Sequence, residues 1–206
     1  MPLLPFPPLL LITDRAQAAG GLPDIVAACV AAGCRWVSLR EKDLPADGQA
    51  GLLAVLRPLL APVGGVLTVH GDPALGLLCD GVHLPDGADI AAVRRRLGPG
   101  ALIGASCHGR AAVAAAARAG ADYATLSPIF PSASKPGYGP ALGAGVLAGL
   151  PLPTLALGGV TAGNLPDCLA AGAAGAAVMG GPMRDPAGMA ALVTALAATR
   201  GRKAGI

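Results

Sequence analysis

The chain contains few aromatic and few charged residues. Of its 206 residues, 2% are aromatic and 13% are charged, and the net charge at pH 7 is only +3. A nucleic-acid-binding surface usually combines clustered basic side chains with aromatic residues, and the sequence has no such stripe. The hydrophobic fraction of 53% is that of a globular protein rather than a disordered one. The composition therefore argues against nucleic acid as a partner and favours one folded domain.

Cysteine motifs and long apolar segments are also lacking. The five cysteines form no Cys-x-x-Cys pair and no Cys/His metal spacing, which predicts reduced thiols in a cytosolic compartment. No apolar run reaches membrane length without glycine, proline or charge. Residues 1–8 lack the positive region of a signal peptide. We therefore expect a cytoplasmic protein without a membrane partner, and we leave open whether it forms a homo-oligomer.

Short apolar segments alternate with Ala/Leu-rich helical segments along the whole chain. Strands this apolar, without polar alternation, are typical of a parallel sheet buried on both faces. The predicted strands are residues 9–12, 36–39, 66–69, 81–84, 102–105, 123–126, 154–157 and 174–179. Helices are expected to begin near Leu22, Ala46, Asp72, Asp89, Gly109, Ala144, Asn164 and Ala187.

This alternation predicts an α/β fold, namely a single-domain (β/α)8 TIM barrel over residues 1–206. Residues 1–8 are expected to be an N-terminal extension and residues 201–206 a flexible tail. Gly33, Gly120 and Gly172 each follow an alanine just before a strand, as helix C-cap glycines do, and this repeat supports the register. A doubly wound open sheet would alternate in the same way and remains the alternative, although its Gly-x-Gly-x-x-Gly fingerprint is missing after the first strand.

Two glycine pairs near the end of the chain predict a phosphate site. Gly158-Gly159 and Gly180-Gly181 each end an apolar run and precede a helical segment, where glycine lets backbone N–H groups approach an anion closely. In (β/α)8 barrels the loops after the seventh and eighth strands frequently form this site. A bulkier residue at Gly159 or Gly181 is expected to weaken ligand binding without unfolding the barrel. Tight turns without a ligand are the alternative for either pair alone.

Polar residues follow most of the predicted strands, and in a barrel these positions meet at one rim. The rim residues are Asp14, Arg15, Arg40, Glu41, Lys42, His70, Asp72, Asp86, Ser106, Cys107, His108 and the segment 127–135. Cations and small hydrogen-bond donors dominate this set, which suits a small phosphorylated anion as ligand.

The chain resembles the thiamine phosphate synthase and TenI superfamily over nearly its whole length. The resemblance is carried in order by Leu11-Ile-Thr-Asp-Arg15, Val37-Ser-Leu-Arg-Glu-Lys42, Asp80-Gly-Val-His-Leu84, Ile103-Gly-Ala-Ser-Cys-His108, Gly120-Ala-Asp-Tyr123, Ser127-Pro-Ile-Phe-Pro-Ser132 with Lys135, and Leu157-Gly-Gly-Val-Thr161 with Asn164. It implies a (β/α)8 barrel that acts on the phosphorylated thiazole of thiamine biosynthesis. Members of the superfamily perform one of two chemistries.

The synthases join a pyrimidine diphosphate to thiazole phosphate with Mg²⁺ held by acidic residues. Counted back from Gly81 without a gap, the Asn-Asp pair of the synthases falls on Thr68 and Val69, and a further Asp falls near Ala88. Valine and alanine cannot ligate magnesium, which requires oxygen donors. We therefore expect no metal and no cofactor, with Mg²⁺ needed only if the synthase alternative holds. Under that alternative a shifted register would assign the metal to Asp72, Asp86 or Asp89.

The preferred interpretation from sequence is a TenI-like thiazole tautomerase. The segment Leu84-Pro-Asp-Gly87 is more similar to the tautomerase Leu-Pro-Ser-Gly than to the matching synthase segment, and the catalytic histidine of that branch matches His108. Imidazole titrates near neutrality, so His108 is suited to move the proton that makes the ring aromatic. A histidine that merely caps the following helix is the structural alternative. A thiamine phosphate synthase and a non-catalytic binding or regulatory protein remain the alternative functions.

Further residues are assigned to substrate binding. Alternation with Glu41 is expected to put Arg40 and Lys42 on one side of an extended segment, where they would grip an anion, unless they pair with Glu41 or Asp43. Ser106 is expected to contact the substrate as well. Ser132 and Lys135 lie in a proline-rich loop, residues 127–143, that is predicted to close as a lid or else to be a stiff connection.

Two further histidines and one cysteine are other candidates for a role in the site. His83 is expected to be a structural residue of the barrel wall, and His70 to be either an anion contact, a second proton carrier or a solvated loop residue. Cys107 is adjacent to His108, so the two side chains should face opposite ways, which argues against a nucleophilic cysteine.

Overall fold

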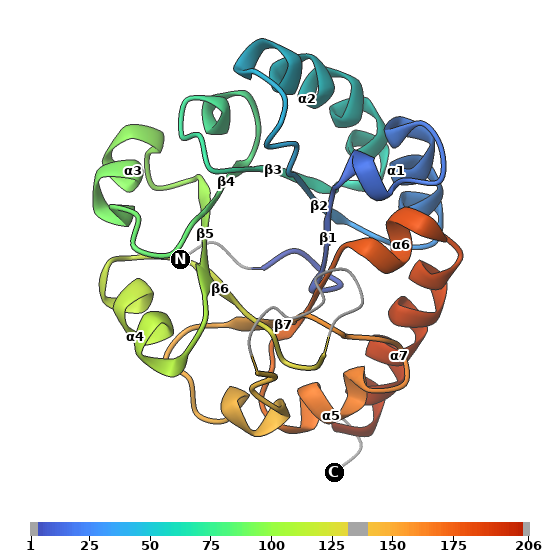
Figure 1. Ribbon diagram of the computed structural model, residues 1–206, viewed down its shortest axis with the longest axis vertical. Coiled ribbons are helices and arrows are strands. Elements are labelled where there is room, and N and C mark those ends of the chain that lie inside the picture. The colour runs from blue at the N-terminus through green and yellow to red at the C-terminus, as the bar shows by residue number, and fades with distance from the viewer. Residues whose placement is uncertain (1–3, 132–139, 204–206) are drawn as a thin grey trace.

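The computed structural model describes residues 4–131 and 140–203, and its eight parallel strands form a closed barrel surrounded by helices (Figure 1). The strands are β1 (Leu9–Ile12), β2 (Trp36–Leu39), β3 (Val66–His70), β4 (Gly81–Leu84), β5 (Leu102–Cys107), β6 (Tyr123–Leu126), β7 (Thr154–Leu157) and β8 (Gly175–Val178). The helices are α1 (Leu22–Ala31), α2 (Ala46–Leu60), α3 (Ile90–Leu97), α4 (Arg110–Arg118), α5 (Leu165–Ala170), α6 (Gly180–Arg184) and α7 (Gly188–Lys203).

The predicted barrel is confirmed, and the open sheet is wrong. β8 pairs in parallel with β1, with Leu9 opposite Ala176, so the sheet closes on itself. Two of the expected helices are only short 3-10 turns, η3 (Leu75–Leu78) and η4 (Ala144–Leu147), and η1 (Arg15–Gln17) and η2 (Ala61–Val63) are further short turns. Helix α6 was not expected, because Gly180, Gly181 and Pro182 together are typical of a turn.

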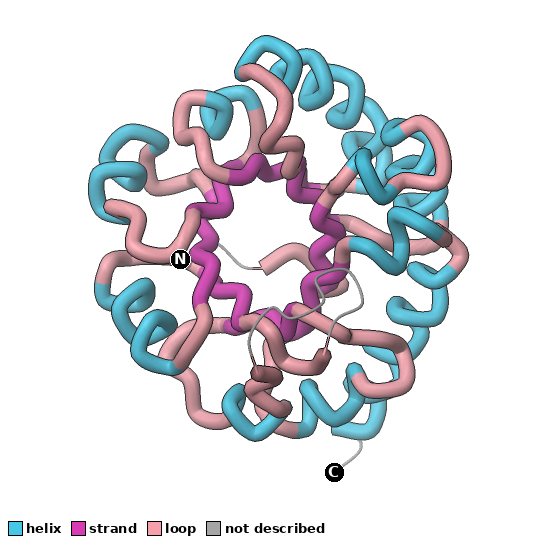
Figure 2. Tube along the Cα trace, viewed as in Figure 1, coloured by secondary structure: helices cyan, strands magenta, loops and turns pink. Residues whose placement is uncertain are grey.

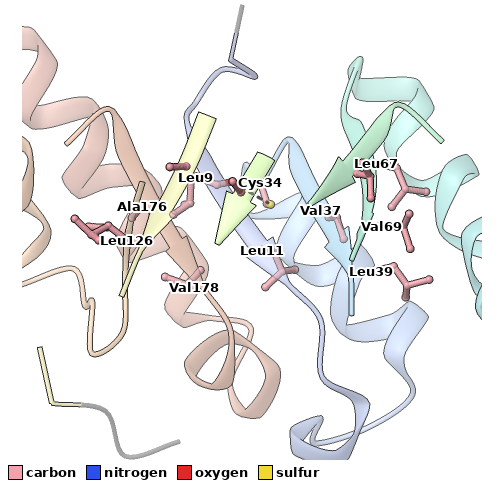
Figure 3. Packing of buried hydrophobic residues seen from close by; sticks show 14 of the residues in the cluster. Leu9, Leu11, Cys34, Val37, Leu39, Leu67, Val69, Leu126, Ala176 and Val178 are labelled. Atoms are coloured by element: carbon pink, nitrogen blue, oxygen red, sulfur yellow. Dashed lines mark hydrogen bonds between the residues drawn. The ribbon is translucent and has the colours of Figure 1, made fainter. Parts of the chain in front are cut away.

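Alternate residues of each strand face two different apolar layers. Leu9 and Leu11 of β1 pack in the apolar layer between the strands and the helices (Figure 3). Leu10 and Ile12 belong to the second cluster, inside the barrel. Figure 2 shows the ring of strands inside the helical layer. Burial on both faces explains why the strands are apolar without alternation. Among the described residues, no helix is long and apolar enough to cross a membrane.

Two aromatic residues fill the barrel interior. The rings of Trp36 and Tyr123 meet edge to face with centroids 4.7 Å apart, and both residues are fully buried. Gly104 makes room for this arrangement, since a Cβ there would lie 2.1 Å from the Tyr123 ring. Leu4 packs against this interior cluster, so part of the expected extension, residues 1–8, contributes to the barrel. Helix α7 continues to Lys203, past the start of the expected tail at residue 201.

Candidate active site

A pocket of about 1050 Å³ opens at the C-terminal ends of the strands. It is lined by residues from every strand or from the loop that follows it, which is where (β/α)8 enzymes place their sites. The predicted site residues that line it are Arg40, Lys42, Ser106, His108, Gly158, Gly159, Gly180 and Gly181. Ser132 and Lys135 lie outside the described residues, as do residues 132–139 of the loop, residues 127–143, that is predicted to be a lid.

Arg40 and Lys42 both line the pocket at the end of β2, as expected, and Glu41 between them lines it too. The residue between them, Glu41, is 3% exposed and accepts a hydrogen bond of 2.7 Å from the Thr13 hydroxyl. The same hydroxyl accepts a hydrogen bond of 2.9 Å from the backbone N–H of Arg40. Thr13 therefore joins the ends of β1 and β2, and it fixes the backbone from which the two cations project.

The acidic residues beside these cations have a different partner. Arg15 pairs with Asp43, its guanidinium lies 4.0 Å from Glu41, and its backbone N–H donates to the Glu41 carboxylate at 3.1 Å. Within the described ranges, neither Arg40 nor Lys42 forms a salt bridge. The alternative that Glu41 or Asp43 neutralises them is therefore wrong. Their charge is directed to the pocket.

Besides Glu41, two further carboxylates line the pocket near these cations. Asp72 follows β3 and Asp86 follows β4, and the two strands are neighbours in the barrel. One carboxylate oxygen of Asp72 accepts a hydrogen bond of 2.7 Å from the backbone N–H of Ala74, so the second oxygen is available to a ligand. Asp89 is used elsewhere, because its side chain caps α3 by accepting from Ala92 N at 2.9 Å.

Val69 is the position that the ungapped count matches to an aspartate of the synthases, and its side chain faces away from the pocket. Its side chain is fully buried in the apolar layer between the strands and the helices. The pocket positions at the end of β3 are His70, Gly71 and Asp72. Counting without a gap therefore placed the comparison inside the strand rather than at the rim. The shifted register that assigned the metal to Asp72, Asp86 or Asp89 instead names two residues that do line the pocket, Asp72 and Asp86.

The rings of His70 and His83 lie against each other at this part of the pocket, tilted by 36°. Their ring centroids are 4.6 Å apart, and both rings line the pocket floor. Burial, and then the charges of His83, Arg40 and Lys42, hold the pKa of His70 well below its usual value, so this ring is neutral. The possibility that His70 is a solvated loop residue is wrong, because His70 ends β3 and its Nε2 is a buried atom that has no hydrogen-bond partner among residues 4–131 and 140–203.

His83 connects the barrel interior to the pocket, in agreement with its predicted structural role. Its Nδ1 lies 3.0 Å from the Tyr123 hydroxyl, and its Nε2 lies 3.0 Å from the Ser106 hydroxyl. Burial lowers the pKa of His83 to about 3 and also raises the pKa of Tyr123, so both groups are uncharged. The chain from Tyr123 through His83 fixes the position of the Ser106 hydroxyl at the pocket.

His108 is exposed at the end of β5 and lines the pocket. Its Nδ1 lies 3.0 Å from the carbonyl oxygen of Ser127, which can only accept, so this nitrogen carries the hydrogen. In the neutral ring, Nε2 is then the basic nitrogen. Cys107, by contrast, is 1% exposed, and burial together with the nearby Asp86 raises the pKa of its thiol to about 11. This argues against a thiolate nucleophile at Cys107.

The first glycine pair is held against the loop that follows β6. Gly158 and Gly159 have positive φ angles of 91° and 64°. A Cβ on Gly159 would lie 2.4 Å from the Pro131 carbonyl oxygen, and one on Gly158 would lie 2.9 Å from Pro128. Asn164 fixes the same loop by donating to the Gly159 carbonyl at 2.9 Å. The expectation that Gly159 tolerates a bulkier residue is therefore wrong, because packing already requires glycine there.

The second glycine pair begins α6, and its two members differ. A Cβ on Gly181 would meet no atom of the described part of the chain within 4 Å, whereas one on Gly180 would lie 2.9 Å from Nη1 of Arg184. Arg184 also lines the pocket, although the sequence did not single it out. The only available signal was a basic residue close to a glycine pair after the eighth strand.

The amino-acid sequence matches the model of one protein family. Residues 9–181 match the family described as thiamine monophosphate synthase. The chain belongs to this family. A thiamine-phosphate synthase of Methanoculleus marisnigri is 37% identical over 179 residues, which cover 83% of this chain and 85% of that protein. A Geobacter sulfurreducens protein, provisionally named a thiamine-phosphate synthase, is 45% identical over 186 residues, which cover 86% of this chain and 87% of that one.

A solved structure shares the fold of this family member. It is a thiamine phosphate pyrophosphorylase from Pyrococcus furiosus, with a TM-score of 0.82 and 23% identity over 93% of this chain and 96% of that chain. The protein is thus a thiamine-biosynthesis enzyme of the thiamine monophosphate synthase family. The names of these relatives indicate the synthase, which was the alternative, and none of the three points to the tautomerase branch.

Proposed function

We propose that the protein is a thiamine phosphate synthase that joins hydroxymethylpyrimidine diphosphate to thiazole phosphate. One observation carries this proposal: a single pocket combines a wall of cations and carboxylates with a separate wall of glycines. A reaction between two phosphorylated substrates needs two places for anions. In the reaction the bond from the pyrimidine methylene to the diphosphate oxygen breaks, and a bond from that methylene to the thiazole nitrogen forms.

Arg40 and Lys42 are the residues that we assign to the diphosphate. Arginine forms a planar fork for phosphate oxygens, and lysine adds a mobile point charge. Because Asp43 and Glu41 are bound by Arg15, neither cation has to leave an acidic partner in order to bind substrate. Their positive charge stabilises the diphosphate as it leaves. This lowers the activation free energy for breaking the bond between the pyrimidine methylene and the diphosphate oxygen.

Asp72 and Asp86 fit the magnesium ion that the synthase reaction requires. Mg²⁺ prefers oxygen ligands and is commonly held by one or two carboxylates together with substrate phosphates. In the described part of the chain no group of three or more His, Cys, Asp or Glu side chains could hold a metal by itself. A pair of carboxylates next to Arg40 and Lys42 matches a metal that shares its ligands with the diphosphate. When bound, Mg²⁺ supplies positive charge to the diphosphate oxygens.

The glycine wall is the place that we assign to thiazole phosphate. Gly158, Gly159, Gly180 and Gly181 all line the pocket, so backbone N–H groups there can approach phosphate oxygens without side chains between them. The Ser106 hydroxyl, which His83 holds in position, is a further donor at the floor between the two walls.

Formation of thiamine phosphate from the two precursors with Mg²⁺ tests the proposal. The wild type should form product, and EDTA should stop the reaction. Asp86→Asn should lower kcat/KM on the order of 10²-fold, because a charged metal ligand is lost. Asp89→Asn is the matched control, since Asp89 caps α3 and does not line the pocket. Product formation at an undiminished rate in EDTA would show that the metal assignment is wrong.

A thiazole tautomerase is the second candidate, and the geometry of His108 favours it. With Nδ1 donating to the Ser127 carbonyl, the basic Nε2 of a neutral His108 can accept a proton from a substrate carbon and return it elsewhere on the ring. The carboxylates Asp72 and Asp86 count against this candidate, because a substrate carboxylate placed beside them would be repelled.

The second candidate is tested by aromatisation of thiazole carboxylate phosphate, followed by its ultraviolet absorbance. If the protein is a tautomerase, His108→Gln should lose turnover on the order of 10²-fold while it keeps phosphate binding. Near-normal turnover in the variant would remove His108 as the proton carrier. Binding of thiazole phosphate without either reaction would instead support a non-catalytic binding protein.

A further inference from the structure

Arg184 ends α6 and lines the same pocket as the glycine pairs. The helix has a single turn, so residue 184 stands one turn beyond Gly180. Side chains of a helix lean toward its N-terminus, which directs the Arg184 side chain back over Gly180. The distance of 2.9 Å between Nη1 of Arg184 and a Cβ placed on Gly180 agrees with this direction.

A short chain of hydrogen bonds holds the guanidinium in place. Nη1 of Arg184 donates to the side-chain oxygen of Gln17 at 2.7 Å, and the Gln17 amide donates to Asp14 at 2.6 Å. Gln17 belongs to η1, which follows β1, and Arg184 to α6, which follows β8, so the contact joins the segments that follow the first and last strands of the barrel. A Cβ on Gly180 would lie 2.6 Å from the same Gln17 oxygen. Glycine at position 180 therefore leaves room for this pair.

The partner of Arg184 is an amide and not an acid. Within residues 4–131 and 140–203, Arg184 forms no salt bridge. Its side chain is exposed to the pocket, and the contact with Gln17 engages one of its two terminal nitrogens. A guanidinium that is oriented by a neutral group keeps its full charge and most of its donors for a ligand.

We propose that Arg184 binds the phosphate monoester at the glycine wall and makes the pocket select a phosphorylated thiazole over its unphosphorylated alcohol. Gln17 is the positioning residue that holds the guanidinium in place. The proposal rests on the proposed function, because that function assigns thiazole phosphate to this wall. It adds a side-chain charge to a site that was otherwise formed by backbone N–H groups.

Calorimetric titration of the purified full chain tests this role with thiazole phosphate and with the thiazole alcohol as probes. Arg184→Gln should weaken binding of the phosphate about 10- to 100-fold and leave binding of the alcohol unchanged, as expected for loss of a charge-assisted hydrogen bond. Arg184→Lys should recover part of the affinity, because the charge is kept and the fork is lost. Gln17→Ala should give a smaller loss, again for the phosphate only.

Arg95→Gln is the matched control, because Arg95 is exposed on α3 and does not line the pocket. Equal phosphate affinities of Arg184→Gln and Arg95→Gln would overturn the proposal, and so would a wild type without affinity for thiazole phosphate. Failure of the synthase proposal has a different signature. In that case the wild type would bind thiazole phosphate but form no thiamine phosphate, and the comparison of the variants would still decide the role of Arg184.

Discussion

The two walls of the pocket bind anions by different means. At the ends of β2 to β4 the groups are charged side chains, namely Arg40, Lys42, Asp72 and Asp86. Thr13 fixes the backbone at Arg40 by accepting a hydrogen bond from its N–H. At the ends of β7 and β8 the groups are glycines, and three of the four sites cannot hold a Cβ without meeting an atom within 3 Å. At the first wall, Arg40 and Lys42 form no salt bridge with a described residue, so loss of either charge breaks no ion pair. At the second wall, recognition and folding depend on the same residues.

This difference separates effects on binding from effects on stability. Substitutions at the charged wall should change ligand affinity and leave the free energy of unfolding nearly constant. Substitutions at Gly158 and Gly159 should first lower stability, because a Cβ there would meet backbone atoms at positive φ. At Gly180 a Cβ would meet only the ends of the flexible Gln17 and Arg184 side chains, and at Gly181 it would meet no described atom within 4 Å. Arg184 combines both features, since its charge stands at the glycine wall.

The largest effect is expected for Gly159→Val. Its φ of 64° is strained for a β-branched residue, and the new Cβ would lie 2.4 Å from the Pro131 carbonyl oxygen. The free energy of unfolding should fall by about 3 kcal/mol or more. Urea denaturation followed by circular dichroism measures this loss. A loss below about 1 kcal/mol would show that the glycine wall is not tied to packing.

Lowering the pH should reduce the free energy of unfolding through His83. The pKa of His83 is lowered from 6.5 to about 3, so between these values the unfolded state binds the extra proton and stability falls as pH falls. From pH 6.5 to pH 4.5 the loss from this group should be roughly 2 to 3 kcal/mol. The measurement is urea denaturation at several pH values. His83→Gln should show a shallower dependence on pH than the wild type, and equal slopes would contradict the assignment.

Arg40→Gln should produce an effect confined to the charged wall. Loss of a guanidinium fork should weaken binding of inorganic pyrophosphate with Mg²⁺ about 10- to 100-fold, and Lys42→Gln should weaken it less. Stability and affinity for thiazole phosphate should not change, and calorimetry measures both ligands. If Arg40→Gln lowered the affinity for thiazole phosphate as strongly as that for pyrophosphate, the two walls would not be separate sites.

The smallest effect is expected for Gly181→Val. The position has open space and no positive φ, so the free energy of unfolding should remain that of the wild type. The new side chain should keep phosphate oxygens away from the backbone N–H groups and weaken binding of thiazole phosphate about 10-fold. Unchanged affinity would place the phosphate elsewhere. A large loss of stability would remove the distinction between Gly181 and Gly159.

Much of the fold could be predicted from local patterns. All eight strands lie where apolar runs were found, and β5 extends two residues farther than predicted, to Cys107. The segment after β3 was expected to be a helix, but it forms only η3. Apolar runs in the sequence predict strands. The structure of a short connection depends instead on the distance between the strand ends that it joins, and the barrel sets that distance.

The site was predictable where it depends on side chains that follow strands. Arg40, Lys42, Ser106 and His108 were placed at the rim by this rule, and they line one pocket. The same rule placed His70 and Asp72 at the rim after β3, and both line the pocket. The separate count back from Gly81 fell on Val69, because a register counted along the sequence cannot locate the end of β3. The rule missed Arg184, whose side chain reaches the pocket only because α6 turns it back over Gly180.

The sequence by itself determined the parallel barrel, the edge at which polar groups gather and the membership of the family. These follow from the period of apolar residues and from motifs that are local in the chain. Only the tertiary structure decided which glycine is free to meet a ligand, which acid neutralises which cation, and that His70 and His83 are neutral. Each of these depends on segments that are distant in sequence but adjacent in space, such as Pro131 beside Gly159 and Gln17 beside Arg184. Burial and charge pairing arise only once the barrel has closed.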